Sequence, residues 1–475
     1  MERIPILTRE KHLALSTLIL SFGTILPKFA ALVTLPVLTC YLAKEDYGAY
    51  DLLLTVVELL LPLSTMRVDA AAFRFLIDNQ NNEKEKSRII TTVLGFIFVS
   101  TLTLAVIINI FITTIPSLFR ILASAYFIIE TFLLTLQMIV RGLSLNKLYS
   151  ISAIVSAFSG MALMVLFVAI LHLQLDGAAL ALTCGVTLAA ILLFFKANIF
   201  HYLKLRYFSF KILKQLLKYS WPMVPGALSL WIIDLSDKFV ITGFLGLAPL
   251  AIYTVAQKLP NMFSSLQMTF TYAWQESASM TVNDTDKSDY YSLVLDLIFR
   301  LLTGALAILI TITPLLFNIF VKGDYSESLK QMPILLMAIL FSAFASFFEG
   351  IYVANKETKK VGLTTALAAV VNVIINLSLI QFCGLYAASV STLLSFVFLT
   401  IYRFKDIKKT TKLSANNHTI ASALFILTIM CFCFWKQGNV IYINFGMCPL
   451  FILLYWRPLF SIIRRKLRKI FRLSL

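Results

Sequence analysis

The chain has 475 residues, of which 59% are hydrophobic, and its mean hydropathy is +0.86. This composition excludes a soluble globular protein, because too few polar residues remain to cover the surface of one. The formal net charge of +17 needs no nucleic-acid partner, since the basic residues gather in short loops between apolar runs, as in proteins of the membrane.

Apolar runs separated by polar breaks predict about fourteen membrane-spanning helices, since roughly 20 apolar residues cross the hydrocarbon layer. The first run is too long for a cleaved signal peptide and is expected to be retained as a span. The sequence therefore predicts an all-α integral membrane protein with spans at 13–41, 47–72, 89–114, 117–140, 148–172, 177–196, 219–245, 249–275, 290–320, 329–354, 361–382, 384–403, 419–435 and 439–457.

The basic residues predict the orientation of these spans. With the N-terminus in the cytoplasm, most Lys and Arg residues fall in the inner loops and tails, and the outer loops hold only Lys44, Arg120, Lys322, Lys330 and Lys436. Because positive loops resist translocation, both termini are predicted to be cytoplasmic. The basic run at 464–472 is predicted to anchor at anionic headgroups rather than to bind nucleic acid.

The largest inner connection predicts a division into two lobes. At the end of this connection, 210–218, apolar residues recur with helical spacing on one face and basic residues on the other. This pattern indicates a helix that lies on the membrane surface. Faint matches between the halves, such as Tyr50 with Tyr253, indicate parallel repeats. We therefore predict a six-helix lobe at 1–196, an amphipathic linker at 197–218, a second six-helix lobe at 219–403, and a C-terminal helix pair with a basic tail at 404–475.

Charged residues inside the predicted spans are the candidate functional residues. A charge near the bilayer centre costs at least about 2.5 kcal/mol, so it normally faces a protein interior or a watery cavity. Within 220–261, Asp234, Asp237 and Lys238 share one face of a helix. The candidates for substrate binding are Lys28, Arg67, Lys238, Lys258 and Arg300, and those for coupling to a proton or cation are Glu58, Asp234 and Asp237.

Ion pairing within a helix is the structural alternative for several of these charges. Asp234 precedes Lys238 by four residues, and Asp296 precedes Arg300 by four, so each pair could neutralise itself. Lys28 has no acidic residue at such a spacing, which favours a substrate role. Asn372 and Asn376 lie one helical turn apart in a later span and fit hydrogen bonding between helices at least as well as substrate contact.

The sequence has no pattern typical of an enzyme or of a metal protein. The six cysteines lack ligand spacing and the four histidines are isolated, so no metal site is expected. Asp284 and Asp286 have the spacing of a glycosyltransferase metal motif, but their loop is too short for a nucleotide-sugar domain. Since no P-loop is present either, neither a cofactor nor catalytic residues are expected.

A resemblance to a known family appears in LSDKFVITGFLGLAPLAIYTVAQKLPNMF (235–263). The segment resembles the seventh and eighth helices of bacterial polysaccharide-export proteins, and it carries their pattern at Asp237, Lys238, Gly246, Tyr253, Ala256 and Lys258. The chain is similar to Wzx-like O-antigen flippases, the polysaccharide branch of the multidrug/oligosaccharidyl-lipid/polysaccharide exporters. It departs from the family's "GAA" turn at 385–388, where it has Leu-Tyr-Ala-Ala.

The resemblance implies a fold and a function. The fold is two six-helix lobes related by a pseudo-twofold, with alternating access; the function is moving an undecaprenyl-pyrophosphate oligosaccharide for O-antigen or capsule across the bacterial inner membrane. The implied partners are membrane lipids, a polysaccharide polymerase and chain-length machinery. Two alternatives stay open. A cation-coupled drug or small-solute antiporter of the multidrug and toxin extrusion type is disfavoured by the intramembrane bases, and a polysaccharide polymerase is disfavoured by the short outer loops.

Overall fold

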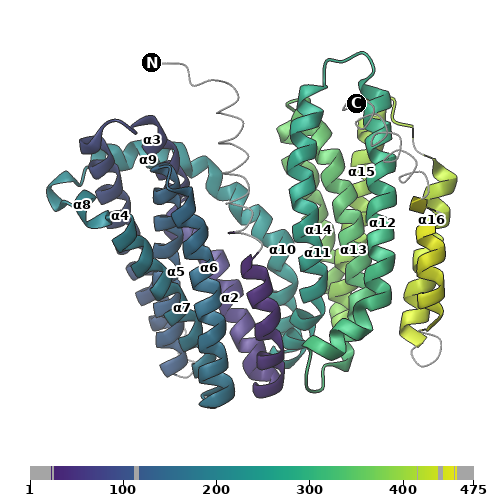
Figure 1. Ribbon diagram of the computed structural model, residues 1–475, viewed down its shortest axis with the longest axis horizontal. Coiled ribbons are helices and arrows are strands. Elements are labelled where there is room, and N and C mark those ends of the chain that lie inside the picture. Colours follow the sequence, from purple (N-terminus) through teal and green to yellow (C-terminus); the bar gives the residue numbers. More distant parts are fainter. Residues whose placement is uncertain are drawn as a thin grey trace, which may run out of the picture. The chain divides into compact units, whose positions relative to one another are not determined.

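The computed structural model describes Gly23 and residues 26–111, 117–414, 416–436, 442–453 and 455–456. Within these residues the chain is helical and has no strand (Figure 1). Ten of the helices are long and apolar enough to cross a membrane, and the segments Leu26–Tyr41 and Tyr442–Leu453 are shorter apolar helices. The prediction of an all-α membrane protein is therefore confirmed, whereas the count of fourteen spans stays a prediction.

Two compact units make up the chain, Met1–Lys238 and Phe239–Leu475. The first holds α2 (Lys44–Thr65), α3 (Val68–Asp78), α4 (Glu83–Phe111), α5 (Ser117–Gly142), α6 (Asn146–Met164), the π-helical turn η1 (Val165–Ile170), α7 (Gln174–Lys196), α8 (Ile199–Tyr202), the 3₁₀ turns η2 (Leu205–Tyr207) and η3 (Trp221–Met223), α9 (Phe210–Ser220) and most of α10 (Val224–Phe244). The second holds α11 (Leu247–Met280), α12 (Lys287–Phe320), α13 (Ser326–Ala354), α14 (Thr358–Cys383), α15 (Leu385–Thr410) and α16 (Asn417–Lys436). The division falls inside α10, and the predicted lobe boundaries stay a prediction.

The predicted second span, 47–72, is interrupted near its C-terminal end. Met66 and Arg67 have φ angles of 47° and 57°, a left-handed conformation that residues other than glycine seldom adopt. The backbone N–H of Arg67 donates to the hydroxyl of Thr65 at 3.1 Å. Two such residues in succession end α2 and start α3 in a new direction, which the apolar pattern of the sequence did not predict.

Helix α9 forms at the amphipathic stretch that the sequence indicated. Ser209 caps its first turn by accepting the backbone N–H of Ile212 at 3.5 Å, and the N–H of Ser209 donates to the hydroxyl of Thr92 on α4 at 3.1 Å. Ile212 and Leu216, one turn apart, are buried against the first unit. One apolar face of α9 is therefore packed against the protein.

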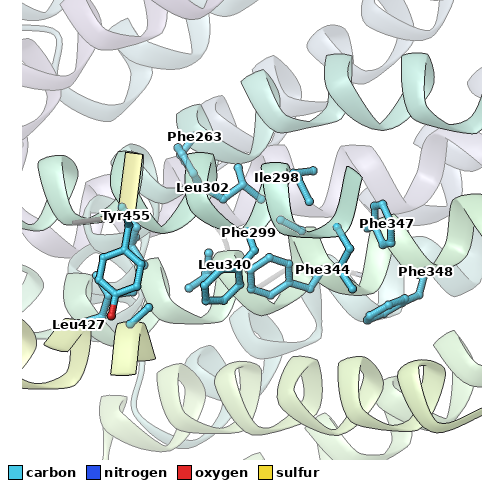
Figure 2. Packing of buried hydrophobic residues seen from close by; sticks show 14 of the residues in the cluster. Phe263, Ile298, Phe299, Leu302, Leu340, Phe344, Phe347, Phe348, Leu427 and Tyr455 are labelled. Atoms are coloured by element: carbon cyan, nitrogen blue, oxygen red, sulfur yellow. The ribbon is translucent and has the colours of Figure 1, made fainter. Parts of the chain in front are cut away.

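The core of the second unit combines aromatic rings with aliphatic side chains from α11, α12, α13 and α16 (Figure 2). The rings of Phe299 and Phe344 stack with centroids 5.5 Å apart. Trp274 stacks on Phe347 at 4.5 Å, and its indole N–H donates to the carbonyl of Phe347 at 2.8 Å. Because the indole N–H is satisfied, the ring can be buried without an unpaired donor.

A buried arginine joins α13, α14 and α15. The side chain of Arg403 is 1% exposed and donates to the carboxylate of Glu349 at 3.1 Å and to the carbonyl of Ala345 at 2.8 Å. It also donates to the hydroxyls of Thr364 and Thr365 at 3.0 and 2.8 Å. These partners compensate the charge, whose burial alone would cost several kcal/mol.

Small residues let α6 and α7 approach each other. A Cβ added to Gly185 would lie 2.9 Å from the backbone of Gly160 and 3.0 Å from the carbonyl of Ser156. Contact between small residues is a usual way for membrane helices to associate, since the hydrophobic effect does not drive them together within lipid.

We expect Gly185→Val to destabilise the protein more than Gly362→Val. Both glycines lie within helices, so the loss of helix propensity is matched, but a Cβ at Gly362 meets nothing within 4 Å. Overpacking at Gly185 should cost about 1–3 kcal/mol and lower the thermal unfolding midpoint of the detergent-solubilised protein by several degrees. Equal midpoints for the two variants would contradict the packing of α6 on α7.

Candidate functional site

An ion pair between helices lies at the centre of the first unit's charged residues. Lys238 Nζ on α10 lies 2.8 Å from Asp51 Oδ2 on α2, and the two side chains are 12% and 4% exposed. Asp237, the neighbour of Lys238, is buried as well. A lysine and a carboxylate this well buried neutralise each other, and removing either one leaves an uncompensated charge.

The structure gives Lys238 a partner that the sequence did not suggest. Four-residue spacing offered Asp234 within the same helix, and the structure shows an ion pair of Lys238 with Asp51 on another helix. The side chain of Asp234 lies outside the described residues. Asp51 follows the first turn of α2, and no spacing rule connects it with a residue that is so distant in the sequence.

Two carboxylates, on α2 and α5, lie within electrostatic range of each other. Glu58 is exposed and Glu130 is half-buried, and the charge of each acts on the other. The hydroxyl of the buried Tyr126 lies within electrostatic range of both. Two ionised carboxylates at such a place repel each other, and a bound proton or cation relieves that repulsion. The sequence offered Glu58 as a coupling candidate but gave no reason to group it with Glu130.

Lys28 is the exposed cation of the predicted site. It lies on the helix Leu26–Tyr41, two residues from its start, and its side chain is exposed. Among the residues that the structure describes, it has no hydrogen bond or ion pair. An ammonium group in an apolar helix needs water or an anionic ligand when the protein supplies no counter-charge.

The other basic candidates are divided between the units. Arg67 is half-buried at the break between α2 and α3, and Lys258 is half-buried on α11, where it has an interaction partner. Arg300 on α12 forms the ion pair that its spacing suggested, with Nε 2.8 Å from Asp296 Oδ2. Its side chain also donates to the carbonyl of Tyr455 at 3.3 Å, which is a structural use of this charge.

One of the two asparagines of α14 bonds to the neighbouring helix α15. Asn372 and Asn376 are buried, and the amide of Asn372 donates to the hydroxyl of Thr392 at 3.4 Å. This is the hydrogen bond between helices that the sequence offered as the alternative to substrate contact. In the described part of the chain, no group of three or more His, Cys, Asp or Glu residues is placed to hold a metal ion.

Solved structures with the same fold are membrane transporters. The lipid II flippase MurJ, in an inward closed conformation, aligns with a TM-score of 0.68 at 16% identity over 96% of this chain and 99% of that one. An inward-facing multidrug resistance MATE family transporter of the MOP superfamily aligns with a TM-score of 0.67 at 16% identity, over 84% and 100%. A MOP superfamily transporter from Pyrococcus furiosus aligns with a TM-score of 0.55 at 14% identity, over 82% and 94%.

At these identities the alignments establish the fold, which is that of flippases and transporters of the MOP superfamily. No curated protein matches the chain by sequence. The model of a protein family does, over residues 13–274, and its description is "Polysaccharide biosynthesis protein". Since that match covers more than half of the 475 residues, the chain belongs to the polysaccharide biosynthesis protein family.

Proposed function

We propose that the chain is a flippase that carries an undecaprenyl-pyrophosphate-linked oligosaccharide, the repeat unit of O-antigen or capsule, across the bacterial inner membrane by alternating access. The observation that carries the proposal is the family match over residues 13–274. The fold supports it, because it is shared with a protein named as a lipid II flippase. The positive loops support cytoplasmic termini.

The headgroup of such a substrate determines what the protein must provide. A pyrophosphate is a strong anion, and lysine holds phosphate as a compact point charge. Lys28 suits this role, since it is exposed within an apolar helix and has no counter-charge among the described residues. Arg67, Lys238, Lys258 and Arg300 are the further candidates. The lipid tail stays in the bilayer while the headgroup crosses.

Coupling to an ion gradient would use the acids of the first unit. The charges of Glu58 and Glu130 act on each other. Because a bound proton or cation would relieve the repulsion between them, the pair favours binding of either one. Asp237 and Asp234 stay candidates for the same role. A polysaccharide polymerase and chain-length machinery are the proposed partners, because they act on the flipped repeat unit.

A cation-coupled antiporter of drugs or small solutes is the second candidate function. The observation that favours it is the same pair of acids on α2 and α5, since cationic solutes need an acidic site. The fold does not separate the two candidates, because a MATE family transporter and a lipid II flippase align with it at TM-scores of 0.67 and 0.68.

We expect Lys28→Gln to lower the export of lipid-linked oligosaccharide about tenfold to a hundredfold, because a hydrogen bond to a charged group is worth about 1.5–3 kcal/mol. The assay uses cells that lack the gene and carry a plasmid copy. Lipid-linked oligosaccharides on the outer leaflet of spheroplasts are labelled with a membrane-impermeant probe. Lys84→Gln, an exposed lysine near the start of α4, is the matched control and should export normally.

Two outcomes of this assay would count against the proposal. Normal outward display in cells without the gene would reject the flippase, and resistance to cationic dyes that depends on the gene would then favour the antiporter. Full export by Lys28→Gln, with accumulation on the inner leaflet in cells without the gene, would keep the flippase and reject Lys28 as its phosphate contact.

Variants of the ion pair between Asp51 and Lys238 can show whether Lys238 stabilises the fold, binds substrate, or does both. Asp51→Asn and Lys238→Gln should each destabilise the protein by about 3 kcal/mol, since each removes one charge of a buried ion pair. The double variant should recover most of that stability, which thermal unfolding in detergent measures as a coupling energy. If Lys238 also binds substrate, the recovered double variant still exports poorly. Recovery of both stability and export would limit Lys238 to a structural role.

A further inference from the structure

A groove of about 720 Å³ lies on the first unit beside the linker helix α9. Its size falls within the range of ligand pockets, about 300–1,000 Å³. Met66, at the break between α2 and α3, lies on its wall, and the remaining lining residues are Phe210, Leu213, Lys214, Leu217, Lys218 and Trp221. The wall is thus apolar except for two lysines.

The groove exists because α9 carries two apolar stripes. Ile212 and Leu216 form the first, which packs into the core. Phe210, Leu213, Leu217 and Trp221 recur every three or four residues and form the second. The protein covers this stripe only in part: Leu213 and Leu217 are half-buried, whereas Phe210 is 78% exposed and Trp221 56%. Lys214 and Lys218, one turn apart on the same helix, are exposed along its edge.

The positive charge of the segment that carries the groove favours an anionic ligand. The segment 196–223 contains no acidic residue, and its basic residues are Lys196, Lys204, Arg206, Lys211, Lys214 and Lys218. The same segment exposes apolar side chains outside the groove, with Leu205 at 93% and Phe200 at 61%. Basic residues interleaved with exposed apolar ones are typical of a surface that meets anionic lipid.

We propose that this groove is a binding site for a resident anionic phospholipid. The lipid phosphate pairs with Lys214 and Lys218, and an acyl chain lies against Phe210, Leu217 and Trp221. A soluble polyanion would satisfy the lysines but leave the apolar wall exposed, whereas a phospholipid satisfies both. Because Met66 lies on the wall, the bound lipid bridges the linker helix to the break between α2 and α3. The site does not depend on which substrate the protein carries.

The test uses the fluorescence of Trp221 in the full-length protein in nonionic detergent. Phosphatidylglycerol with brominated acyl chains is titrated into the wild type and into Trp221→Phe, and the difference between their quenching isolates Trp221. We expect saturable quenching that brominated phosphatidylcholine reproduces only at concentrations about tenfold higher.

Matched charge variants locate the lipid. Lys214→Gln combined with Lys218→Gln should raise the half-saturating phosphatidylglycerol concentration about tenfold or more, since each lysine near a lipid surface contributes about 1 kcal/mol. Lys204→Gln combined with Lys211→Gln removes the same charge from the same segment but outside the groove, and should change that concentration less than twofold. All four lysines are exposed, so neither variant should disturb folding.

Three results would overturn the site. Equal quenching by both lipids would mean ordinary contact with mixed micelles. Equal weakening by both double variants would mean diffuse attraction to the basic surface. If undecaprenyl pyrophosphate displaced the brominated lipid at a much lower concentration than unlabelled phosphatidylglycerol, the groove would bind the transported substrate rather than a resident phospholipid.

Discussion

Placing a charge among apolar helices costs free energy, and this cost determines which helices pack against each other in this protein. Lys238 on α10 and Asp51 on α2 lie 2.8 Å apart and are both nearly buried, so neither helix can leave the other without exposing a charge to an apolar environment. The second unit meets the same constraint with Arg403 on α15, which donates to Glu349 and a backbone carbonyl on α13 and to two hydroxyls on α14. Paired charge is therefore part of the helix packing in both units.

Two other charged residues of the first unit have different surroundings. Lys28 is exposed and has no partner among the described residues, and Glu58 acts on Glu130 with a charge of the same sign. These surroundings support the proposed roles of the two residues toward a ligand and an ion. The left-handed pair at Met66 and Arg67 is a third costly feature, and it lies beside the groove of α9.

Much of the fold could be predicted from the sequence, because the signals are local. Apolar runs of sufficient length predict helices in the membrane, since lipid leaves the backbone no other way to satisfy its hydrogen bonds. The 3.6-residue periodicity of 210–218 predicted α9, and the four-residue spacing of Asp296 and Arg300 predicted an ion pair that the structure contains. In each case all the residues concerned lie on one helix, so helical geometry alone relates them.

The sequence by itself thus determined the helices, their apolar spans and the contacts within one helix. Only the tertiary structure decided which helix faces which. It paired Lys238 with Asp51 on a distant segment, and it buried Arg403 among three helices. It also left Phe210 and Trp221, at the two ends of the second apolar stripe of α9, exposed. The physical reason is that periodicity and spacing act over a few turns of one helix, whereas the partner of a buried charge or apolar face is set by packing between segments distant in the sequence.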